Sequence, residues 1–436
     1  MKHVVVGAGT AGFNAITTLL SIQPDADVTL VSAEVPYARM VLPYYLSSEI
    51  EEGNVYTITP SRLEELGVKL QLGARASGLD RVAKRVLLEG GGSVEYDHLL
   101  IATGSSSVRP PVPGIDGERV FDHWTLADTQ ALRAVIRPGA EVAIVGAGFI
   151  AFTIVNPLLH AGCKLTLIER EPHVLPRMLN AEAAAVLEGW LRDHGVAIHT
   201  RASLERIEDA PDGSKRVIVN GSALSTQYSV LVIATGIRPN LEWLRDSGLS
   251  IDRGLIVDEQ LRTNDPAVYA AGDVAEVRDA VTGQRAVMAI ETAAMEQGRI
   301  VGAAMAGQPR TYAGGMLMNV IESAGLQAAS FGDWAGSAAT EGRAAGGHYR
   351  RYIWDGDRLT GAVIVGPAHQ VAGENDMGML KGLVQSGRPL GRWQRLLAER
   401  PFEVRKAFLS AGSVADLLPR TVLGEPSKPL EAALRS

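Results

Sequence analysis

The chain begins with a short apolar run that breaks into closely spaced glycines and then into a helical pattern, and this feature limits the possible folds more than any other. Residues 4–6 are typical of a buried strand, and the helical pattern runs over residues 13–20. Between them, Gly7 suits a tight turn, Gly9 lets the backbone approach a pyrophosphate, and Gly12 lets helix and strand pack closely. Unpaired N–H groups at the start of the helix would face the phosphates. The pattern predicts a dinucleotide-binding unit.

An acidic residue follows at the place that such a unit requires. The next apolar run, residues 28–31, ends near Glu34, whose carboxylate is placed to accept hydrogen bonds from a ribose. A glycine-rich turn before a helix is often only a turn. Here, strand, glycines, helix, second strand and acid follow one another in order, and this order favours the dinucleotide site.

The same pattern occurs a second time. Another apolar run leads into Gly146 and Gly148, Ala151 stands at the place of the third glycine, which the motif tolerates, and the following strand ends at Glu169. Two such units in one chain are far more specific than either alone. We expect a kink in the second helix, because Pro157 removes one hydrogen bond and crowds the preceding turn, at a cost of roughly 3 kcal/mol.

Each unit is followed by a buried strand that ends in Ala-Thr-Gly, first at residues 102–104 and again at residues 234–236. A further strand ends at Gly272-Asp273. An aspartate after a strand-ending glycine can bind sugar-like hydroxyl groups, although such a pair is more often only a turn.

The composition excludes several classes of function. A net charge of −7 argues against nucleic-acid binding. The single cysteine, Cys163, excludes an internal disulfide framework and the thiolate clusters of zinc sites, so we expect no metal centre. No stretch approaches the roughly 18 unbroken apolar residues that a membrane span needs. The N-terminus does not fit a signal peptide either, and we therefore expect a cytoplasmic protein.

The last part of the chain has a different residue pattern. A proline-rich crossing over residues 109–114 is typical of a domain linker. From about residue 312, alternating stretches predict antiparallel strands, and helical stretches follow over residues 377–386 and 392–409. We predict an α/β fold with two Rossmann-like dinucleotide-binding domains and a C-terminal α+β interface domain.

The ordered set of motifs resembles the FAD-dependent pyridine nucleotide–disulfide oxidoreductase family, over residues 1 to about 310 and more faintly to the end. The resemblance implies a glutathione-reductase-like fold with FAD and NAD(H) as cofactors. It implies that FAD is held by Gly7, Gly9, Gly12, Glu34, Arg39, Ala102, Thr103, Gly104, Gly272, Asp273 and Gln297, and the nicotinamide nucleotide by Gly146, Gly148, Ala151, Glu169 and Gly236. Asp273 would bind the flavin ribitol, and the helix near Gln297 would approach the pyrimidine edge of the flavin.

In this family the FAD-binding domain is split, with the NAD(H)-binding domain inserted between its halves. The predicted parts are residues 1–112 and 241–311 for the FAD-binding domain, residues 113–240 for the NAD(H)-binding domain, and residues 312–436 for an interface domain that would form a homodimer. The last hundred residues contain only two histidines, His348 and His369. They do not match the C-terminal His-Glu pair of glutathione-reductase-like enzymes, and we expect structural or solvent-exposed roles for both.

The segment from Tyr37 to Tyr45 resembles the branch of coenzyme A-disulfide reductases, NADH oxidases and peroxidases, in which a reactive cysteine precedes the Leu-Pro-Tyr sequence. Here that position is Met40, and a thioether cannot act as a thiolate nucleophile. Tyr37 and Arg39 instead resemble the rubredoxin-reductase and nitrite-reductase-like members, in which an arginine at this point helps to hold FAD. Cys163 precedes a strand of the second unit, and we expect it to be a small buried apolar residue.

The resemblance implies a flavoprotein that moves electrons between NADH and an external acceptor or donor, with a redox protein as the leading candidate, and that uses flavin alone. No side-chain acid or nucleophile is required for the NADH half-reaction. Glu169 favours NADH over NADPH by repelling a 2′-phosphate, while Arg170 leaves some tolerance for one. Two alternatives stay open: a flavin-only NADH oxidase or small-molecule reductase, and an NADH-responsive flavoprotein with a binding or regulatory role.

Overall fold

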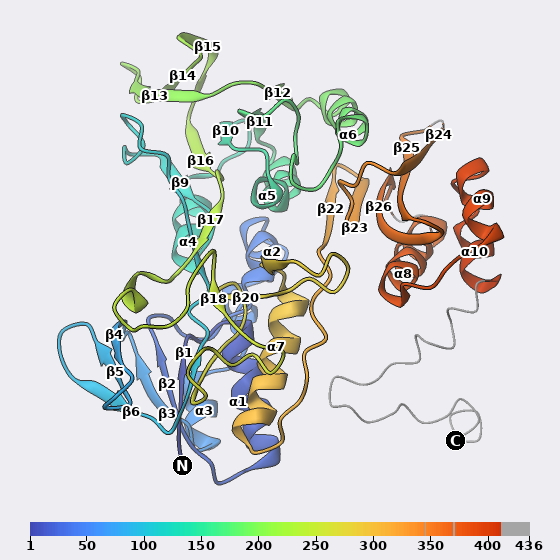
Figure 1. The fold of residues 1–436 in the computed structure, drawn as a ribbon. Helices are drawn as coiled ribbons and strands as arrows, with labels where there is room; N and C mark the ends of the chain where they lie inside the picture. Colours follow the sequence, from blue (N-terminus) through green and yellow to red (C-terminus); the bar gives the residue numbers. More distant parts are fainter. Residues whose placement is uncertain (345, 369–370, 411–436) are drawn as a thin grey trace.

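Two parallel five-stranded sheets and one antiparallel five-stranded sheet form the framework of the protein (Figure 1). The structure is a computed structural model that describes residues 1–344, 346–368 and 371–410. The predicted α/β fold with two Rossmann-like units and a C-terminal α+β region is confirmed.

The first parallel sheet is built from segments far apart in the sequence. Its strand order is β19-β7-β1-β2-β3, and each neighbouring pair is parallel. The strands are β1 (Lys2–Val6), β2 (Asp27–Ser32), β3 (Lys69–Leu72), β7 (His98–Ile101) and β19 (Val268–Ala270). Because β19 pairs with β7, the part of the chain that follows the second nucleotide unit completes the sheet begun at the N-terminus.

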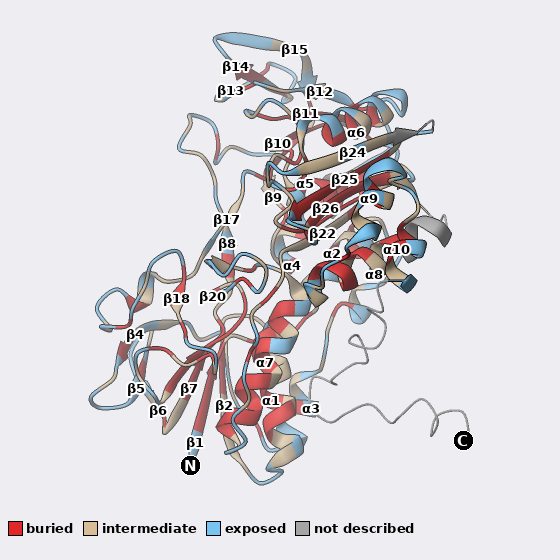
Figure 2. Cartoon of the chain, turned by 45° about the vertical axis from the view of Figure 1, so that its right-hand side comes forward, coloured by how far each residue is buried: buried red, intermediate tan, exposed pale blue. Residues whose placement is uncertain are grey.

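Two helices pack backbone to backbone on this sheet, and they join the same two parts of the chain. These helices are α1 (Thr10–Ile22) and α7 (Glu291–Met305), which lie side by side in Figures 1 and 2 with their facing surfaces buried. A Cβ atom on Gly298 would lie 2.3 Å from the carbonyl oxygen of Ala11, and one on Gly302 would lie 2.3 Å from that of Ala15. Only glycine therefore fits at these two positions of α7.

The second parallel sheet repeats the arrangement of the first. Its order is β12-β11-β10-β16-β9, so the strand after each glycine motif lies next to the one before it. The strands are β9 (Val120–Asp122), β10 (Glu141–Val145), β11 (Lys164–Ile168), β12 (Ala197–His199) and β16 (Val230–Ile233), with helices α4 (Leu126–Val135), α5 (Phe149–His160) and α6 (Ala181–Asp193). Helix α5 continues through Pro157 to His160. Cys163 is buried in the core of this unit, as predicted.

Short strands and helical turns connect and flank the two units. The chain crosses between the units through β8 (Ser105–Ser107) and returns through β17 (Ile237–Pro239), and these two strands pair antiparallel. Smaller sheets are β4 (Ala76–Asp80), β5 (Arg85–Leu88) and β6 (Ser93–Glu95); β13 (Leu204–Asp209), β14 (Lys215–Val219) and β15 (Ser222–Tyr228); and β18 (Leu255–Ile256), β20 (Ala275–Arg278) and β21 (Arg285–Val287). The short helices are η1 (Arg39–Val41), α2 (Leu42–Leu46), η2 (Glu52–Asn54), α3 (Pro60–Glu65) and η3 (Glu242–Leu244).

The C-terminal region is an antiparallel sheet with helices on one face. Its strand order is β22-β23-β26-β25-β24. The elements are β22 (Met318–Ser323), β23 (Leu326–Gly332), β24 (Ala339–Ala344), β25 (His348–Asp355), β26 (Arg358–Pro367), α8 (Val371–Ser386), α9 (Arg392–Glu399) and α10 (Val404–Ser410). The expectation of one helical stretch over residues 392–409 is wrong, because the helix breaks at Pro401, whose ring cannot continue a helix. His348 stacks edge-on against Phe402, while His369 and residues 411–436 lie outside the described residues.

The C-terminal sheet shares a hydrophobic core with the second nucleotide unit. Ile321, Leu326 and Tyr349 of the sheet pack in one cluster with the helices that flank β10 and β11. The side-chain amide of Asn156 on α5 donates to the carbonyl oxygen of Glu322 at 3.1 Å, and its oxygen accepts from the N–H of Ala324 at 2.7 Å. The second unit and the C-terminal sheet are thus joined by packing and by hydrogen bonds.

None of the helices formed by the described residues is long and apolar enough to cross a membrane.

Two histidines face each other inside the first sheet. His3 on β1 pairs directly with His98 on β7, and their ring centroids are 5.3 Å apart. His3 is 2% exposed, and burial, followed by the proximity of His98, lowers the pKa of His3 to about 4; burial also lowers the pKa of His98. Both side chains are therefore neutral in the folded protein near pH 7.

This pair predicts acid sensitivity. The folded pKa of His3 lies below the unfolded value of 6.5, so the unfolded chain binds more protons between the two values and stability falls as pH drops from 6.5 to about 4. The loss for His3 amounts to about 3 kcal/mol. We expect His3→Phe to flatten the free energy of unfolding over this range, as measured by denaturant titration at several pH values. The same change at exposed His160 should leave the slope as in the wild type, and parallel profiles for all three proteins would contradict the prediction.

Candidate functional site

A cavity of about 480 Å³ lies at the carboxyl ends of the strands in the first sheet. This is the edge at which open parallel sheets bind their ligands. The structure brings together nine of the residues predicted to hold FAD, which line this cavity: Gly7, Gly9, Glu34, Arg39, Ala102, Thr103, Gly104, Gly272 and Asp273.

The three glycines of the first motif differ in what surrounds them. A Cβ atom on Gly7 would lie 2.1 Å from the carbonyl oxygen of Ala102, and Gly7 also has a φ of +111°. A Cβ atom on Gly12 would lie 2.0 Å from the carbonyl oxygen of Gly7, so Gly12 serves close packing and does not line the cavity. A Cβ atom on Gly9 would meet nothing within 4 Å, because that side of Gly9 is open.

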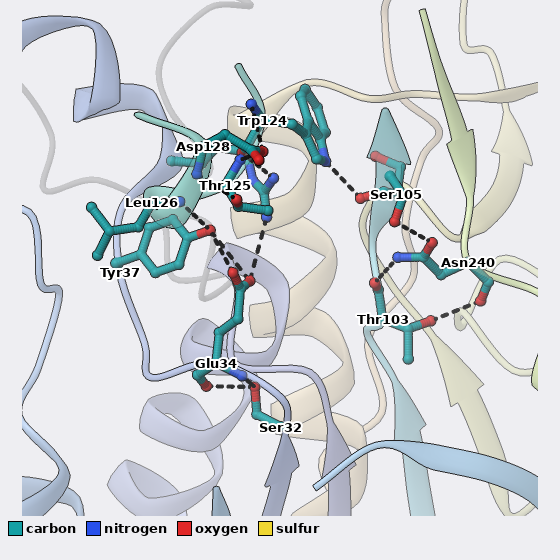
Figure 3. Close-up of polar contacts among 12 residues, drawn as sticks. Ser32, Glu34, Tyr37, Thr103, Ser105, Trp124, Thr125, Leu126, Asp128 and Asn240 are labelled. Carbon is teal, nitrogen blue, oxygen red and sulfur yellow. Dashed lines mark hydrogen bonds and ion pairs between the residues drawn. The ribbon is translucent and has the colours of Figure 1, made fainter. Parts of the chain in front are cut away.

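The carboxylate of Glu34 is held in a network that reaches the start of α4 (Figure 3). The hydroxyl of Tyr37 donates to the two oxygens of Glu34 at 3.3 and 3.2 Å, and it accepts from the N–H of Leu126 at 3.2 Å. Burial raises the pKa of Tyr37 to about 12, so its hydroxyl keeps the proton that it donates. The side chain of Glu34 is 42% exposed and has room to accept ribose hydroxyls.

Arg39 and Trp124 stack on each other at the rim of the cavity. The guanidinium carbon of Arg39 lies 4.6 Å from the centre of the Trp124 ring, and Arg39 also donates to the carbonyl oxygen of Trp124. The indole N–H of Trp124 donates to the carbonyl oxygen of Ser105 at 2.7 Å (Figure 3). A nitrogen of Arg39 is 4.0 Å from a carboxylate oxygen of Glu34. The guanidinium is thereby fixed in orientation, with its charge partly balanced.

The side chain of Asp273 is aimed at the first crossing strand. Its carboxylate accepts from the Ser105 hydroxyl at 2.6 Å. Burial raises the pKa of Asp273 above its usual value, although the hydrogen bond from Ser105 acts in the opposite direction. A carboxylate in this setting gains from a further hydrogen-bond donor, such as a ligand hydroxyl.

The structure places Gln297, a residue predicted to hold FAD, behind the Gly272 turn. Gln297 is completely buried and does not line the cavity. Its side-chain oxygen accepts from the N–H of Gly272 at 2.8 Å, and its side-chain nitrogen donates to the Tyr312 hydroxyl at 3.3 Å. Both polar groups are therefore used to hold the Gly272 turn from behind. From α7, residues Glu291 and Ala294 line the cavity instead.

Two residues that the motifs did not indicate complete the wall. The side-chain nitrogen of Asn240 donates to the carbonyl oxygen of Thr103 at 2.8 Å, and the hydroxyl of Thr103 donates back to the carbonyl oxygen of Asn240 at 3.2 Å (Figure 3). Trp243 also lines the cavity, and its buried Nε1 has no hydrogen-bond partner among the described residues. The only available signal was the position of Asn240 shortly after the second Ala-Thr-Gly.

A second cavity, of about 750 Å³, lies at the carboxyl ends of the strands in the second sheet. Gly146, Gly148, Glu169 and Gly236 line it, as the repeat predicts. A Cβ atom on Gly146 would lie 2.4 Å from the carbonyl oxygen of Ala234, whereas one on Gly148 would meet nothing within 4 Å. In the second loop, as in the first, one glycine lies against a carbonyl oxygen and the next is open on the side of a Cβ atom.

Two residues predicted for the second site behave differently from the expectation. Ala151 is completely buried in the hydrophobic core and lines neither cavity, so its small size serves helix packing only. Glu169 lines the cavity but is only 6% exposed, and both of its oxygens accept hydrogen bonds from backbone N–H groups, of Ala147 at 2.7 Å and of Glu171 at 2.9 Å. Its carboxylate is already used to hold the loop.

The two cavities meet at a shared wall. Arg39, Met40, Trp124 and Ala289 line both of them. Met40 is 46% exposed there. Nearby, His123 lines the second cavity, and burial lowers its pKa to about 4, so its imidazole is neutral. Ligands in the two cavities could therefore approach each other without a thiol between them.

The residues present fit a flavin dinucleotide in the first cavity. Gly9 offers an open backbone surface for a pyrophosphate, Glu34 an acceptor for a ribose, and Asp273 an acceptor for further hydroxyls. The unpartnered N–H of Trp243 offers a donor. The second cavity combines the same kind of open glycine with acidic and basic side chains, and it suits a nicotinamide dinucleotide.

Comparisons with known proteins agree with this assignment. Residues 1–298 match the family described as pyridine nucleotide-disulphide oxidoreductase. The epsilon subunit of NADH-dependent phenylglyoxylate dehydrogenase from Aromatoleum evansii is 29% identical over 420 residues, which cover 94% of this chain and 97% of that protein. Rubredoxin-NAD(+) reductase from Alcanivorax borkumensis is 29% identical over 279 residues, which cover 63% of this chain and 72% of that protein.

A solved structure shows the same fold over most of the chain. The NAD-dependent persulfide reductase from A. fulgidus superposes with a TM-score of 0.81 at 30% sequence identity, covering 90% of this chain and 78% of the other.

Proposed function

Because the chain belongs to the pyridine nucleotide-disulphide oxidoreductase family, we propose that it moves electrons between NADH and a separate redox protein through bound FAD, without a redox-active thiol. The observation that carries this proposal is the shared wall of the two cavities. There, Met40, Arg39 and Trp124 stand between the nucleotide sites, and the only cysteine of the chain lies elsewhere.

FAD supplies the redox chemistry when bound, because it can take a hydride from NADH and release electrons to an acceptor. The side chains of the protein bind and orient the two nucleotides. Glu34 and Asp273 offer acceptors to hydroxyl groups, and the open sides of Gly9 and Gly148 admit the pyrophosphates. Arg39, fixed on Trp124, places a positive charge at the meeting point.

We propose the following domain boundaries. Residues 1–112 and 241–311 form the FAD-binding domain, residues 113–240 form the NAD(H)-binding domain, and residues 312–436 form the interface domain. The pairing of β19 with β7 and the packing of α7 on α1 support a single FAD-binding domain made from two parts of the chain.

A protein partner is supported by the names of two relatives. The Aromatoleum protein is by name a subunit of a dehydrogenase, and the Alcanivorax protein is by name a rubredoxin-NAD(+) reductase. Both names carry NAD as the nucleotide. We therefore propose a separate redox protein as the partner of this chain.

Anaerobic rapid mixing of the FAD-loaded protein with NADH tests the proposal. We expect fast loss of the visible flavin absorbance, followed by its return when an oxidised rubredoxin or ferredoxin is added. If NADH does not lower the visible flavin absorbance, the proposal is contradicted. Return of the absorbance only with oxygen would favour an NADH oxidase, and a long-lived reduced state with every acceptor would favour a regulatory role.

Removal of the only thiol should leave electron transfer intact. Cys163 is 6% exposed within the core of the second unit, and burial raises its pKa, so its thiol is neutral and inaccessible. We expect Cys163→Ala to keep the rate of flavin reduction by NADH within about twofold while costing about 1 kcal/mol of stability. Stopped-flow absorbance and thermal melting measure the two effects. A large loss of rate in a variant with a normal melting temperature would indicate that the thiol takes part in electron transfer.

A further inference from the structure

The loop after β11 carries acidic and basic side chains into the second cavity. Glu169, Arg170, Glu171 and Arg177 all line it. In the proposed function this cavity binds NADH, and the inference below rests on that function. The loop follows the second strand of the nucleotide unit, at the place where such units contact the adenosine ribose.

Both oxygens of the Glu169 carboxylate already accept hydrogen bonds from the backbone. One oxygen accepts from the N–H of Ala147 inside the glycine loop at 2.7 Å, and the other accepts from the N–H of Glu171 at 2.9 Å. Glu169 is 6% exposed. Its two hydrogen bonds connect the glycine loop to the end of β11 and hold the loop in place.

The carboxylate of Glu171 is the accessible one. Its side chain is 44% exposed, and one of its oxygens accepts from Nε of Arg170 at 3.2 Å. The side chain of Arg170 is 71% exposed, and Arg177 is exposed as well. Two guanidinium groups of this loop therefore line the cavity, and Glu171 neutralises one of them.

We propose that Glu171 is the residue that determines the preference for NADH over NADPH. Its free oxygen accepts a hydrogen bond from the 2′-hydroxyl of the adenosine ribose, and its charge repels a 2′-phosphate. Without this carboxylate, Arg170 and Arg177 present two cations to the same cavity, and paired cations favour a phosphate monoester.

Binding measurements on the FAD-loaded protein test this assignment. The dissociation constants of NAD⁺, NADP⁺ and adenosine 2′,5′-bisphosphate are measured by calorimetry for the wild type and for Glu171→Gln, and flavin reduction is followed with NADH and with NADPH. We expect Glu171→Gln to bind NADP⁺ and the bisphosphate roughly tenfold or more tightly than the wild type, because a repulsion is removed and Arg170 is released. NAD⁺ should bind a few times more weakly, since one hydrogen bond is lost.

Two further variants separate this role from other effects. Glu205→Gln removes the same charge from an exposed position of the same unit, outside the cavity, and should leave all three constants as in the wild type. Glu169→Gln should weaken NAD⁺ and NADP⁺ by the same factor, and lower the melting temperature, because the glycine loop loses its support. A change of preference in Glu169→Gln but not in Glu171→Gln would overturn the inference.

The outcomes also separate this inference from the proposed function. If neither nicotinamide nucleotide binds the wild-type protein, both ideas fail together. If NAD⁺ binds and NADH reduces the flavin, but Glu171→Gln keeps the wild-type discrimination, only the assignment of Glu171 is wrong.

Discussion

Gly9→Val should purify as a folded, colourless protein. The φ of Gly9 is −70°, which any residue adopts, and a Cβ atom there would meet nothing within 4 Å. The chain can therefore accept the side chain without strain. The same open side faces the cavity, so the two methyl groups of valine would occupy the place of the pyrophosphate. We expect FAD affinity to fall by roughly a hundredfold or more, since backbone contact with the phosphates requires glycine here.

Visible absorbance of the purified variant and titration of its FAD-free form with FAD measure this loss, and circular dichroism reports on the fold. Gly53→Val is the matched control, because Gly53 is also exposed with nothing within 4 Å of a Cβ atom, but it does not line the cavity. Gly12→Val is expected to differ from both. Its Cβ atom would lie 2.0 Å from the carbonyl oxygen of Gly7, so it should disrupt the fold itself. A yellow Gly9→Val protein with one FAD per chain would show that this motif does not hold the flavin.

The sequence was most informative where a whole unit is encoded locally. Each nucleotide unit places its strand, glycines, helix and acid within a few dozen residues, so spacing alone predicted both dinucleotide-binding units. The Ala-Thr-Gly strands make contacts that their spacing did not predict. The carbonyl oxygens of Ala102 and Ala234 lie against Gly7 and Gly146, which explains why each glycine loop occurs together with such a strand.

Contacts between distant segments were not predictable from spacing. The hydrogen bond from Leu126 to Tyr37 joins residues 89 positions apart, and the stacking of Arg39 on Trp124 joins two different units. Neither partner belongs to a periodic pattern, so no local signal marks them. The hydrogen bonds of Glu169 were not predictable either. Its place at the end of a strand indicates a ribose acceptor, and in the structure its carboxylate accepts from backbone N–H groups.

The shared core of the second unit and the C-terminal sheet joins these two parts of the chain beside the second cavity. Because Ile321 and Leu326 pack in the core of the second unit, the C-terminal sheet is fixed relative to the second cavity. Asn319 on the edge strand β22 lines that cavity directly. Strand β22 therefore belongs both to the C-terminal sheet and to the wall of the second cavity.

Gly148→Val should separate the two cofactor sites. Gly148 begins α5 with a φ of −87°, and a Cβ atom there would meet nothing within 4 Å, so the fold should accept valine. Its open side lines the second cavity, where the side chain would displace the pyrophosphate of NADH. We expect a yellow protein with normal FAD content whose reduction by NADH is slowed by roughly a hundredfold at low NADH concentration, because binding is lost.

Stopped-flow absorbance over a range of NADH concentrations distinguishes weaker binding from slower chemistry, and dithionite should still reduce the flavin fully. Gly189→Val, at an exposed glycine of α6 with nothing within 4 Å of a Cβ atom, controls for the added side chain in the same unit. Reduction of Gly148→Val at the wild-type rate would mean that NADH reaches the flavin by another route. In that case the shared wall of Arg39, Met40 and Trp124 would mark the entry of a different electron donor, and the second glycine motif would bind its nucleotide for some purpose other than reduction of the flavin.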